Sequence, residues 1–286
     1  MQEIASRVYI ENSYPGVTLG AINWPHGLIL IDAPFRAEDA RSWRSALLNL
    51  GGGVERLLIN LDSHLDRTLG ARAMDCTVVG HEKTASIFSE RPLTFKAQPG
   101  EGGAEWEMVN GLGSVRWAPP EITFSHHLQI EWDNSPILLQ HRPGPTAGSI
   151  WVELLEQQVI FLGDAVMPNQ PPFLASADLP AWMETLRALE QPQYANATLV
   201  SGRGGVVLME DVRRQIELLS RVQNALEALH RADAAPEQTL SLVDELLSGF
   251  QFPGEFRSLY RQRLVGGLIQ YYRAKFCPTP ETHASP

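Results

Sequence analysis

Short apolar runs dominate the first two thirds of this chain, and apolar residues spaced three and four positions apart dominate its last third. Short apolar runs between turn residues are typical of strands that are buried on both faces. They predict strands at Val8–Ile10, Val17–Ile22, Gly27–Ile31, Glu55–Leu61, Cys76–Val79, Ile150–Leu155, Gln158–Leu162 and Thr198–Ser201, with further strands between Val115 and Gln140. Thr198–Ser201 is predicted to be the last strand.

Helical periodicity alternates with these runs. It predicts helices at Ala37–Leu50 and Glu82–Phe88, and another that begins after Asp178, a suitable N-cap. After Gly205 the apolar stripe becomes continuous, and it predicts helices at Met209–Arg231, Pro236–Leu247 and Pro253–Phe276. We therefore expect a mixed α/β domain over residues 1–204 and a helical extension over residues 205–286. The stripe is expected to pack on its own domain, with a homodimer as the alternative.

Composition narrows the class of protein. The chain has 286 residues, 44% of them hydrophobic, and a formal net charge of −10. This acidity argues against binding to nucleic acid or to an anionic membrane surface, because both need clustered Lys and Arg. No apolar run reaches the roughly 18 residues of a membrane-spanning helix, and the first residues do not resemble a signal peptide. The only two cysteines, Cys76 and Cys277, make no disulfide framework, so a cytoplasmic location is expected.

One segment, Ile59–Gly70, carries the strongest chemical signal. It begins in a predicted strand and continues into a loop, with the sequence Ile-Asn-Leu-Asp-Ser-His-Leu-Asp-Arg-Thr-Leu-Gly. It resembles a metal-binding motif, His-x-His-x-Asp-His followed by Gly. Asp62 stands at the first His position and Arg67 at the last, while His64 and Asp66 keep the residue types of the motif.

Four more segments, in chain order, complete a resemblance to the metallo-β-lactamase superfamily. Leu28–Ala33 resembles the second strand of the family with its terminal Asp, and Val159–Asp164 resembles the strand that ends in Gly and the metal-bridging Asp. His141–Ser149 resembles Pro-Gly-His-Thr-x-Gly-Ser, and Ser201–Gly204 resembles Pro-Gly-His-Gly. The resemblance covers about residues 1–204. It implies a four-layer αββα sandwich, to which the C-terminal helical extension is added.

The resemblance also implies where metal ligands belong. Working members of the family bind two metals, usually zinc, and a metal-bound hydroxide attacks a carbonyl or phosphoryl centre. At the positions of the first metal this chain has Asp62, His64 and Pro145. At the positions of the second metal it has Asp66, Arg67 and Arg203, and the bridging carboxylate is Asp164.

Three of these replacements, Pro145, Arg67 and Arg203, remove ligands outright. Proline has no donor atom in its side chain, and a guanidinium group does not lose its proton at usable pH. We therefore predict that the chain has no standard dinuclear zinc centre. The carboxylates of Asp62, Asp66 and Asp164 would converge in one pocket, where burial without a cation is costly. Arg67 and Arg203 are predicted to replace the positive charge of the metals through hydrogen bonds to these carboxylates.

A residual mononuclear site is the rival hypothesis. Asp62, His64 and Asp164, with Asp66 nearby, offer oxygen and nitrogen ligands suited to zinc, manganese or iron. The expected cofactor is therefore none, or one weakly bound divalent metal. If the protein is an active enzyme, Asp66 is the residue expected to take part in catalysis. Three further residues are expected at the rim of the site: Asp32, His141 and Pro145.

Three classes of function follow. The first is a hydrolase-like protein with a degenerate metal site, a pseudoenzyme that binds a small molecule or regulates. The second is an active hydrolase of an ester, lactone or thioester with one unusual metal or none. The third is a structural subunit that assembles through its helical extension.

Overall fold

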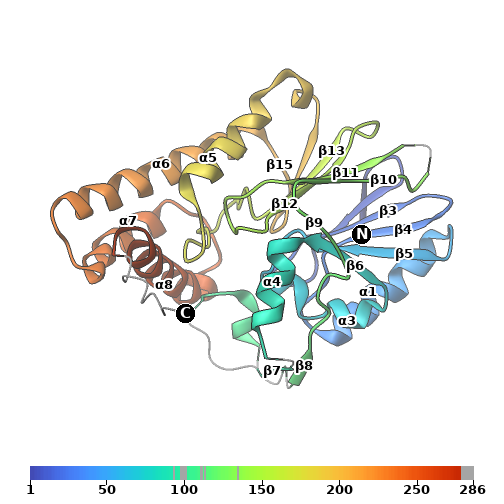
Figure 1. The fold of residues 1–286 in the computed structure, drawn as a ribbon, viewed down its shortest axis with the longest axis horizontal. Coiled ribbons are helices and arrows are strands. Elements are labelled where there is room, and N and C mark those ends of the chain that lie inside the picture. The colour runs from blue at the N-terminus through green and yellow to red at the C-terminus, as the bar shows by residue number, and fades with distance from the viewer. Residues whose placement is uncertain (93, 97–101, 110–111, 113, 134, 278–286) are drawn as a thin grey trace, which may run out of the picture.

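The computed structural model describes residues 1–92, 94–96, 102–109, 112, 114–133 and 135–277 (Figure 1). Within these residues the first sheet has the strand order β1 (Gln2–Ala5), β2 (Val8–Glu11), β3 (Leu19–Asn23), β4 (Gly27–Ile31), β5 (Glu55–Ile59), β6 (Thr77–His81) and β9 (Ile122–Phe124). Strands β1 to β4 pair antiparallel, and β4, β5, β6 and β9 pair parallel.

The second sheet has the order β10 (His127–Ile130), β11 (Ile137–His141), β12 (Ile150–Leu154), β13 (Val159–Gly163), β14 (Thr198–Ser201) and β15 (Gly205–Val207). Among the described strands of this sheet, β13 and β14 pair parallel and the other neighbours pair antiparallel. A separate two-stranded sheet pairs β7 (Thr94–Lys96) antiparallel with β8 (Ser114–Arg116).

The α-helices are α1 (Ala37–Leu47), α2 (Leu65–Thr68), α3 (Ala71–Met74), α4 (Glu82–Glu90), α5 (Leu179–Arg187), α6 (Met209–Arg231), α7 (Val243–Ser248) and α8 (Arg257–Phe276). Short 3₁₀ helices are η1 (Leu48–Leu50), η2 (Glu105–Met108), η3 (Ala188–Glu190), η4 (Pro192–Tyr194), η5 (Pro236–Leu242) and η6 (Gly254–Phe256). No helix in the described ranges is both long and apolar enough to cross a membrane.

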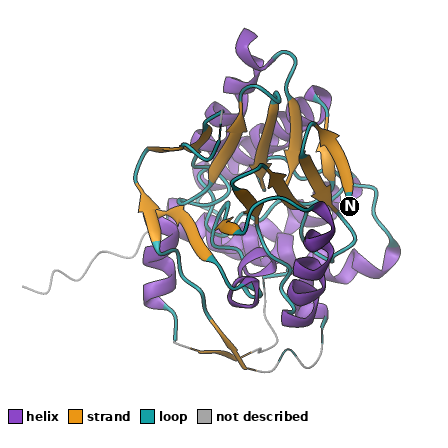
Figure 2. Cartoon of the chain, turned by 90° about the vertical axis from the view of Figure 1, so that its right-hand side faces the viewer, coloured by secondary structure: helices purple, strands orange, loops and turns teal. Residues whose placement is uncertain are grey.

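The two sheets pack face to face, and helices cover their outer faces (Figures 1 and 2). Alternation along β4 shows how the layers are built, because successive side chains of a strand point to opposite faces. Ile29 and Ile31 join the core between the sheets, whereas Leu28 and Leu30 join the core beneath α1 and α3. The predicted αββα sandwich is therefore confirmed.

The C-terminal helices extend the outer core of the second sheet. Buried residues of α6, α7 and α8 share one apolar cluster with Trp151 on β12 and Leu162 on β13. The helical extension thus packs on the sandwich rather than standing apart from it.

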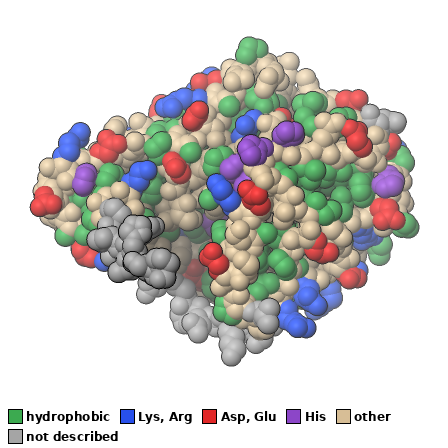
Figure 3. Space-filling view, viewed as in Figure 1, with side chains coloured by type: hydrophobic (Ala, Val, Ile, Leu, Met, Phe, Trp, Pro, Cys, Tyr) green, Lys and Arg blue, Asp and Glu red, His purple; other side chains and the backbone are tan. Residues whose placement is uncertain are grey.

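The face seen in Figure 3 carries acidic and basic side chains scattered among one another.

Most predicted elements are present, and the differences have simple causes. The helix predicted at Met209–Arg231 has those bounds, and Asp178 caps α5 by accepting a hydrogen bond from the Ala181 N–H at 3.0 Å. The prediction that Thr198–Ser201 is the last strand was wrong, because Gly205–Val207 adds an edge strand beside it. This strand begins at the second of two consecutive glycines, which are typical turn residues, so only Val206 and Val207 carry a strand signal in the sequence. The proposed domain boundary at residue 204 remains a prediction.

Candidate functional site

The candidate site lies where strand ends of both sheets meet. Asp32 follows β4 and Asp62 follows β5, so the parallel pairing of these strands brings both carboxylates to one edge. Asp164 follows β13, and Arg203 follows β14, its parallel neighbour. A backbone hydrogen bond of 2.9 Å, from Ile150 N to Leu61 O, joins the second sheet to the loop that carries Asp62. Residues far apart in the sequence therefore meet because of strand order.

A tight turn orients the segment 62–68. The Asp62 carboxylate accepts a hydrogen bond from the His64 backbone N–H at 2.8 Å, and His64 is the N-cap residue of α2. The Thr68 hydroxyl donates to the His64 carbonyl at 2.8 Å and closes the single helical turn. This turn holds Asp66 and Arg67 fully buried, so both side chains point into the protein.

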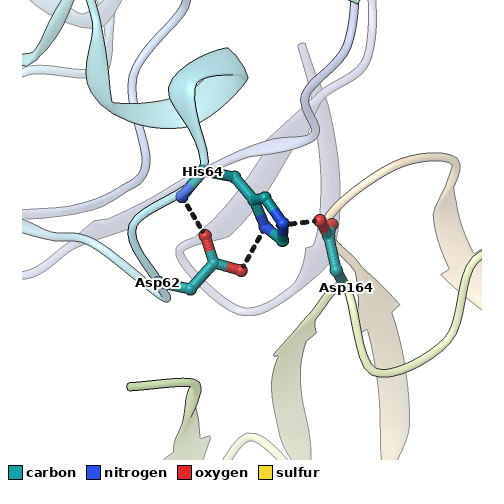
Figure 4. Close-up of side chains that lie close together, drawn as sticks. All are labelled: Asp62, His64 and Asp164. Atoms are coloured by element: carbon teal, nitrogen blue, oxygen red, sulfur yellow. Dashed lines mark hydrogen bonds and ion pairs between the residues drawn. The ribbon is translucent and has the colours of Figure 1, made fainter. Parts of the chain in front are cut away.

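The His64 ring lies between two carboxylates (Figure 4). Its Nδ1 atom is 3.0 Å from Asp62 Oδ2 and 3.1 Å from Asp164 Oδ2. Burial opposes the charged ring, but the Asp62 and Asp164 carboxylates outweigh burial and raise the pKa of His64 to about 9. The ring is therefore a cation at neutral pH.

Arg67 is the central cation of the site. Its Nη1 atom donates to Asp32 Oδ2 at 3.1 Å, its Nη2 atom donates to Asp164 Oδ1, and its Nε atom forms an ion pair with Asp62 Oδ1 at 3.2 Å. The side chain has no exposed surface. One planar guanidinium group thus contacts three carboxylates, an arrangement that a point-like ammonium group cannot reproduce.

Arg203 is the second buried cation. Its Nε atom donates to both oxygens of Asp164 at 3.0 and 3.1 Å, and its Nη1 atom donates to Asp66 Oδ2 at 2.7 Å. The other oxygen of Asp66 accepts from the Trp106 backbone N–H at 2.9 Å. Each of the carboxylates predicted to converge here therefore has an arginine within ion-pair distance.

The balance of burial and charge differs between the carboxylates. Burial alone raises a carboxyl pKa, but Arg203 and Arg67 outweigh burial and hold the pKa of Asp164 well below its ordinary value. At Asp62 the Arg67 and His64 charges also outweigh burial and lower the pKa. At Asp32 burial outweighs Arg67, and the pKa rises to about 7. Asp32 also accepts a hydrogen bond from the Leu61 N–H at 3.0 Å, which fixes the loop before Asp62.

Gly202 makes room for the Arg67 side chain. A Cβ atom at residue 202 would lie 2.8 Å from both Nη1 and Nη2 of Arg67, closer than side chains pack. The guanidinium group therefore sits against bare backbone.

Two of the three predicted rim residues lie along β11 and the loop that follows it. The His141 ring stacks on His81 with ring centroids 3.9 Å apart, and its Nε2 atom is 2.9 Å from the Ala147 carbonyl. Pro145 is buried in the loop between β11 and β12. A 2.8 Å hydrogen bond from the backbone N–H of Asp178, the N-cap of α5, to the Gly144 carbonyl joins this loop to the helix. The predicted roles of His141 and Pro145 remain predictions.

Sequence reasoning missed a third buried arginine, Arg263. Its Cζ atom lies 3.9 Å from the centroid of the Phe173 ring, and Arg203 Cζ lies 4.7 Å from the same centroid. The Phe173 ring also contacts the His64 ring, with centroids 4.8 Å apart. A signal for Arg263 existed, because it falls on the buried stripe of α8 between Tyr260 and Leu264.

A groove of about 470 Å³ opens beside these residues. Its walls combine the 12–18 segment, the loop after β13 and the segment that leads into α8. Arg203 and Glu105 line it, together with the rings of Phe252 and Phe256. Burial raises the pKa of Glu105 despite the nearby Arg203 charge. The groove is of the size typical of small-molecule sites, roughly 300–1,000 Å³.

The described residues contain one group that could hold a metal ion. Asp62, His64 and Asp164 each offer a ligand atom, and these atoms lie within 4.8 Å of one another. They are the three residues of the predicted mononuclear site.

The His64 contacts predict a loss of stability at alkaline pH. Because the pKa of His64 is raised to about 9 in the folded protein, from about 6.5 in the unfolded chain, the stabilisation is complete below pH 6.5 and disappears as pH rises through 9. We expect a decrease on the order of 3 kcal/mol in the free energy of unfolding across this interval. Urea unfolding from pH 6 to pH 9.5 measures it, and His64→Gln should flatten the slope. Equal slopes for both proteins would contradict the ion-pair assignment.

Comparisons with known proteins agree with the geometry. The family model described as the metallo-beta-lactamase superfamily matches residues 64–204. A search of curated proteins finds no match.

Among solved structures, a metallo-beta-lactamase from Pontibacter korlensis is 20% identical, with a TM-score of 0.59, and the match covers 77% of this chain and 97% of that one. A metallo-beta-lactamase from Erythrobacter litoralis is 16% identical, with a TM-score of 0.54 and coverages of 77% and 99%. The sec-alkylsulfatase Pisa1 from Pseudomonas sp. is 15% identical, with a TM-score of 0.70. That match covers 96% of this chain, so it reaches into the C-terminal helices, but only 49% of the sulfatase.

Proposed function

Because this chain belongs to the metallo-β-lactamase superfamily, we propose that it is a metal-independent member that binds a small molecule without hydrolysing it. In this proposal Arg67 and Arg203 supply the positive charge that metal ions supply in working enzymes of the family. The fold is kept, and the site has changed from a metal centre into a buried ion-pair network.

One observation carries this proposal: two arginine side chains make ion pairs with all the carboxylates available to a metal. Asp164, at the bridging position, contacts Arg67 through Oδ1 and Arg203 through both oxygens. Asp62 and Asp66 each contact one of the same two cations. In such a network the arginine charges compensate the buried carboxylate charges, so burial of the carboxylates does not require an added cation.

The donor chemistry opposes a divalent ion at this place. A metal ligand must offer a lone pair, but the His64 Nδ1 atom faces two carboxylates and the raised pKa keeps its proton. An ion between Asp62 and Asp164 would also lie close to two permanent guanidinium charges, and like charges at short range repel strongly. The residues present therefore do not fit a standard dinuclear centre.

The groove lined by Arg203 and Glu105 supports the binding part of the proposal. It combines a few polar groups with aromatic walls, the usual composition of a small-molecule site. Its aromatic wall comes from Phe252 and Phe256, in the segment that leads into α8. The helical extension would then serve to complete a binding site.

The alternative function is a hydrolase of an ester, lactone or thioester with a single metal. The cluster of Asp62, His64 and Asp164 favours it, because its three ligand atoms are close enough to surround one ion. Binding would require His64 to lose its proton and would bring the ion next to Arg67.

Elemental analysis distinguishes the two functions. Protein purified without chelators is expected to contain well under one zinc, manganese or iron atom per chain, and its melting temperature should not change with EDTA or with added zinc. An ion bound at one per chain, whose removal lowers the melting temperature, would support the mononuclear hydrolase. Two tightly bound zinc ions would overturn the proposed function.

A further inference from the structure

Arg263 is a buried cation without a carboxylate partner. Its side chain is 1% exposed, and its hydrogen bonds go to neutral oxygens: the Gly103 carbonyl at 2.8 Å, Gln170 Oε1 at 2.9 Å and the Pro171 carbonyl at 2.9 Å. Among the described residues, no carboxylate oxygen lies within the 4.0 Å of an ion pair. Burying an unpaired charge is unfavourable, so proteins rarely keep one that has no use.

Two guanidinium groups leave donors unused in this region. The Nη2 atoms of Arg203 and Arg263 are both buried, and neither has a hydrogen-bond partner among the described residues. Both guanidinium groups contact the Phe173 ring, so they belong to one cluster. A buried donor without an acceptor is unfavourable, and the charge of both guanidinium groups leaves this region with a positive potential that no acceptor compensates.

Arg263 lies directly behind one wall of the groove. That wall is formed by Gln170 and Tyr260, with Arg203 beside them. The Gln170 side-chain oxygen accepts a hydrogen bond from Arg263, so the Gln170 amide nitrogen is left as a donor. Arg263 Cζ also lies 4.6 Å from the centroid of the Tyr260 ring. The positive potential of Arg263 therefore acts on this wall, in surroundings that screen charge less than water does.

The rest of the groove is apolar on one side. The Phe252 and Tyr260 rings meet edge to face at 5.0 Å, and the Phe256 ring stacks on Tyr260 at 5.4 Å. Phe252 and Phe256 line the groove next to the donor wall. A ligand that reaches both therefore has an acceptor group at one end and an apolar part at the other.

We propose that this groove binds a small organic oxyanion, with its carboxylate, sulfate or phosphate head against the wall of Arg203, Gln170 and Tyr260. Its apolar part packs on Phe252 and Phe256. This inference rests on the proposed function, because it needs Arg203 in the ion-pair network rather than a metal at that position.

Glu105 opposes such a ligand and provides a test. Glu105 lines the same groove, and its carboxyl group accepts a 3.5 Å hydrogen bond from the Tyr260 hydroxyl. A negative charge there repels an anionic head group. Glu105→Gln should therefore tighten binding several-fold, whereas the variant would weaken the binding of a cation.

The experiment compares a matched series of six-carbon probes by calorimetry at constant ionic strength. Hexanoate, hexyl sulfate and hexyl phosphate carry the shared oxyanion chemistry, and hexan-1-ol is the uncharged control. We expect at least one anion to bind saturably and at least tenfold more tightly than hexan-1-ol. The rank order of the three anions identifies the head group.

Arg263→Met is the decisive variant. It removes the buried charge, so its affinity for the anion should fall at least tenfold. Because it also leaves three oxygens without their donor, the affinity is measured well below the melting temperature of the variant. Arg261→Met, an exposed position on the same helix that pairs with Asp244, is the matched control and should bind like wild type.

Equal binding of hexan-1-ol and the anions, or an unchanged affinity in Arg263→Met, would overturn the inference. If Arg263→Met does not fold, the direction of the Glu105→Gln effect decides instead. Metal-free protein that binds no anion overturns only this inference. Protein that binds the anion solely when loaded with metal overturns the proposed function as well.

Discussion

Arg203→Ala is expected to lower the free energy of unfolding by about 3–5 kcal/mol at pH 7, because it leaves the buried Asp66 carboxylate without its cation and removes one of the two arginines that contact Asp164. Arg203 contacts both oxygens of Asp164 and one oxygen of Asp66, and its side chain is nearly inaccessible to solvent. Removing one partner of a buried pair costs far more than the pair itself contributes, since the remaining charge keeps its desolvation penalty. Urea unfolding at pH 7 measures the loss.

The same variant should have a characteristic pH dependence. Because Arg203 and Arg67 outweigh burial and hold the pKa of Asp164 below its ordinary value, the pairing stabilises the protein above the carboxyl pKa of the unfolded chain. That stabilisation disappears as pH falls through the folded pKa. In Arg203→Ala a buried carboxylate that has lost its arginine can bind a proton and become neutral. The difference in the free energy of unfolding between the variant and wild type should therefore shrink as pH falls towards about 4.

Arg213→Ala is the matched control. Arg213 also pairs with a carboxylate, that of Glu190 at 3.8 Å, but its side chain is 63% exposed. Water and salt screen such a pair, so its loss should have little effect. If Arg203→Ala unfolds like Arg213→Ala at neutral and acidic pH, the two arginines do not compensate the carboxylates and the proposed function loses its main support.

Buried strands made the fold predictable from the sequence. A strand covered on both faces needs apolar residues at every position, and every residue of β4 and β13 is apolar or glycine and buried. Each ends at a polar residue, Asp32 or Asp164, so a parallel neighbour on the same edge brings functional groups together. Arg67 and Arg203 lie in segments that follow one another as in the family that the chain resembles. Their places in these segments predicted that both would contact the carboxylates.

The remaining features depend on contacts that no local pattern encodes. The edge strand β15 is recognisable only by its pairing with β14, since it begins directly after Gly204 with a second glycine, a sequence typical of turns. Arg263 and Glu105 are 158 positions apart, and only the packing of α8 against the 103–108 segment places Arg263 behind the groove that Glu105 lines. The acidic composition gave no hint of an anion site, because overall charge does not determine the local potential.

Arg67→His combined with Arg203→His is expected to create a zinc site at these two positions. The resemblance places both residues at ligand positions of one metal, together with Asp66 and Asp164. The double substitution removes two permanent charges and adds two neutral imidazole donors, and neutral imidazoles with carboxylates are the ligands that zinc prefers. Without metal, the variant should be destabilised by its unpaired carboxylates.

Zinc should then restore the stability of the double variant. A metal that binds only the folded state adds about 2.7 kcal/mol at one hundred times its dissociation constant, so the melting temperature should rise with zinc and one ion should remain after desalting. Arg67→Ala combined with Arg203→Ala is the control, because it loses the same charges and gains no donors. Equal zinc binding by the two double variants would show that the carboxylates alone hold the ion. A folded histidine variant that binds no zinc would show that residues 67 and 203 do not occupy the ligand positions that the family resemblance implies, and the charge-replacement hypothesis would then have to rest on the ion pairs alone.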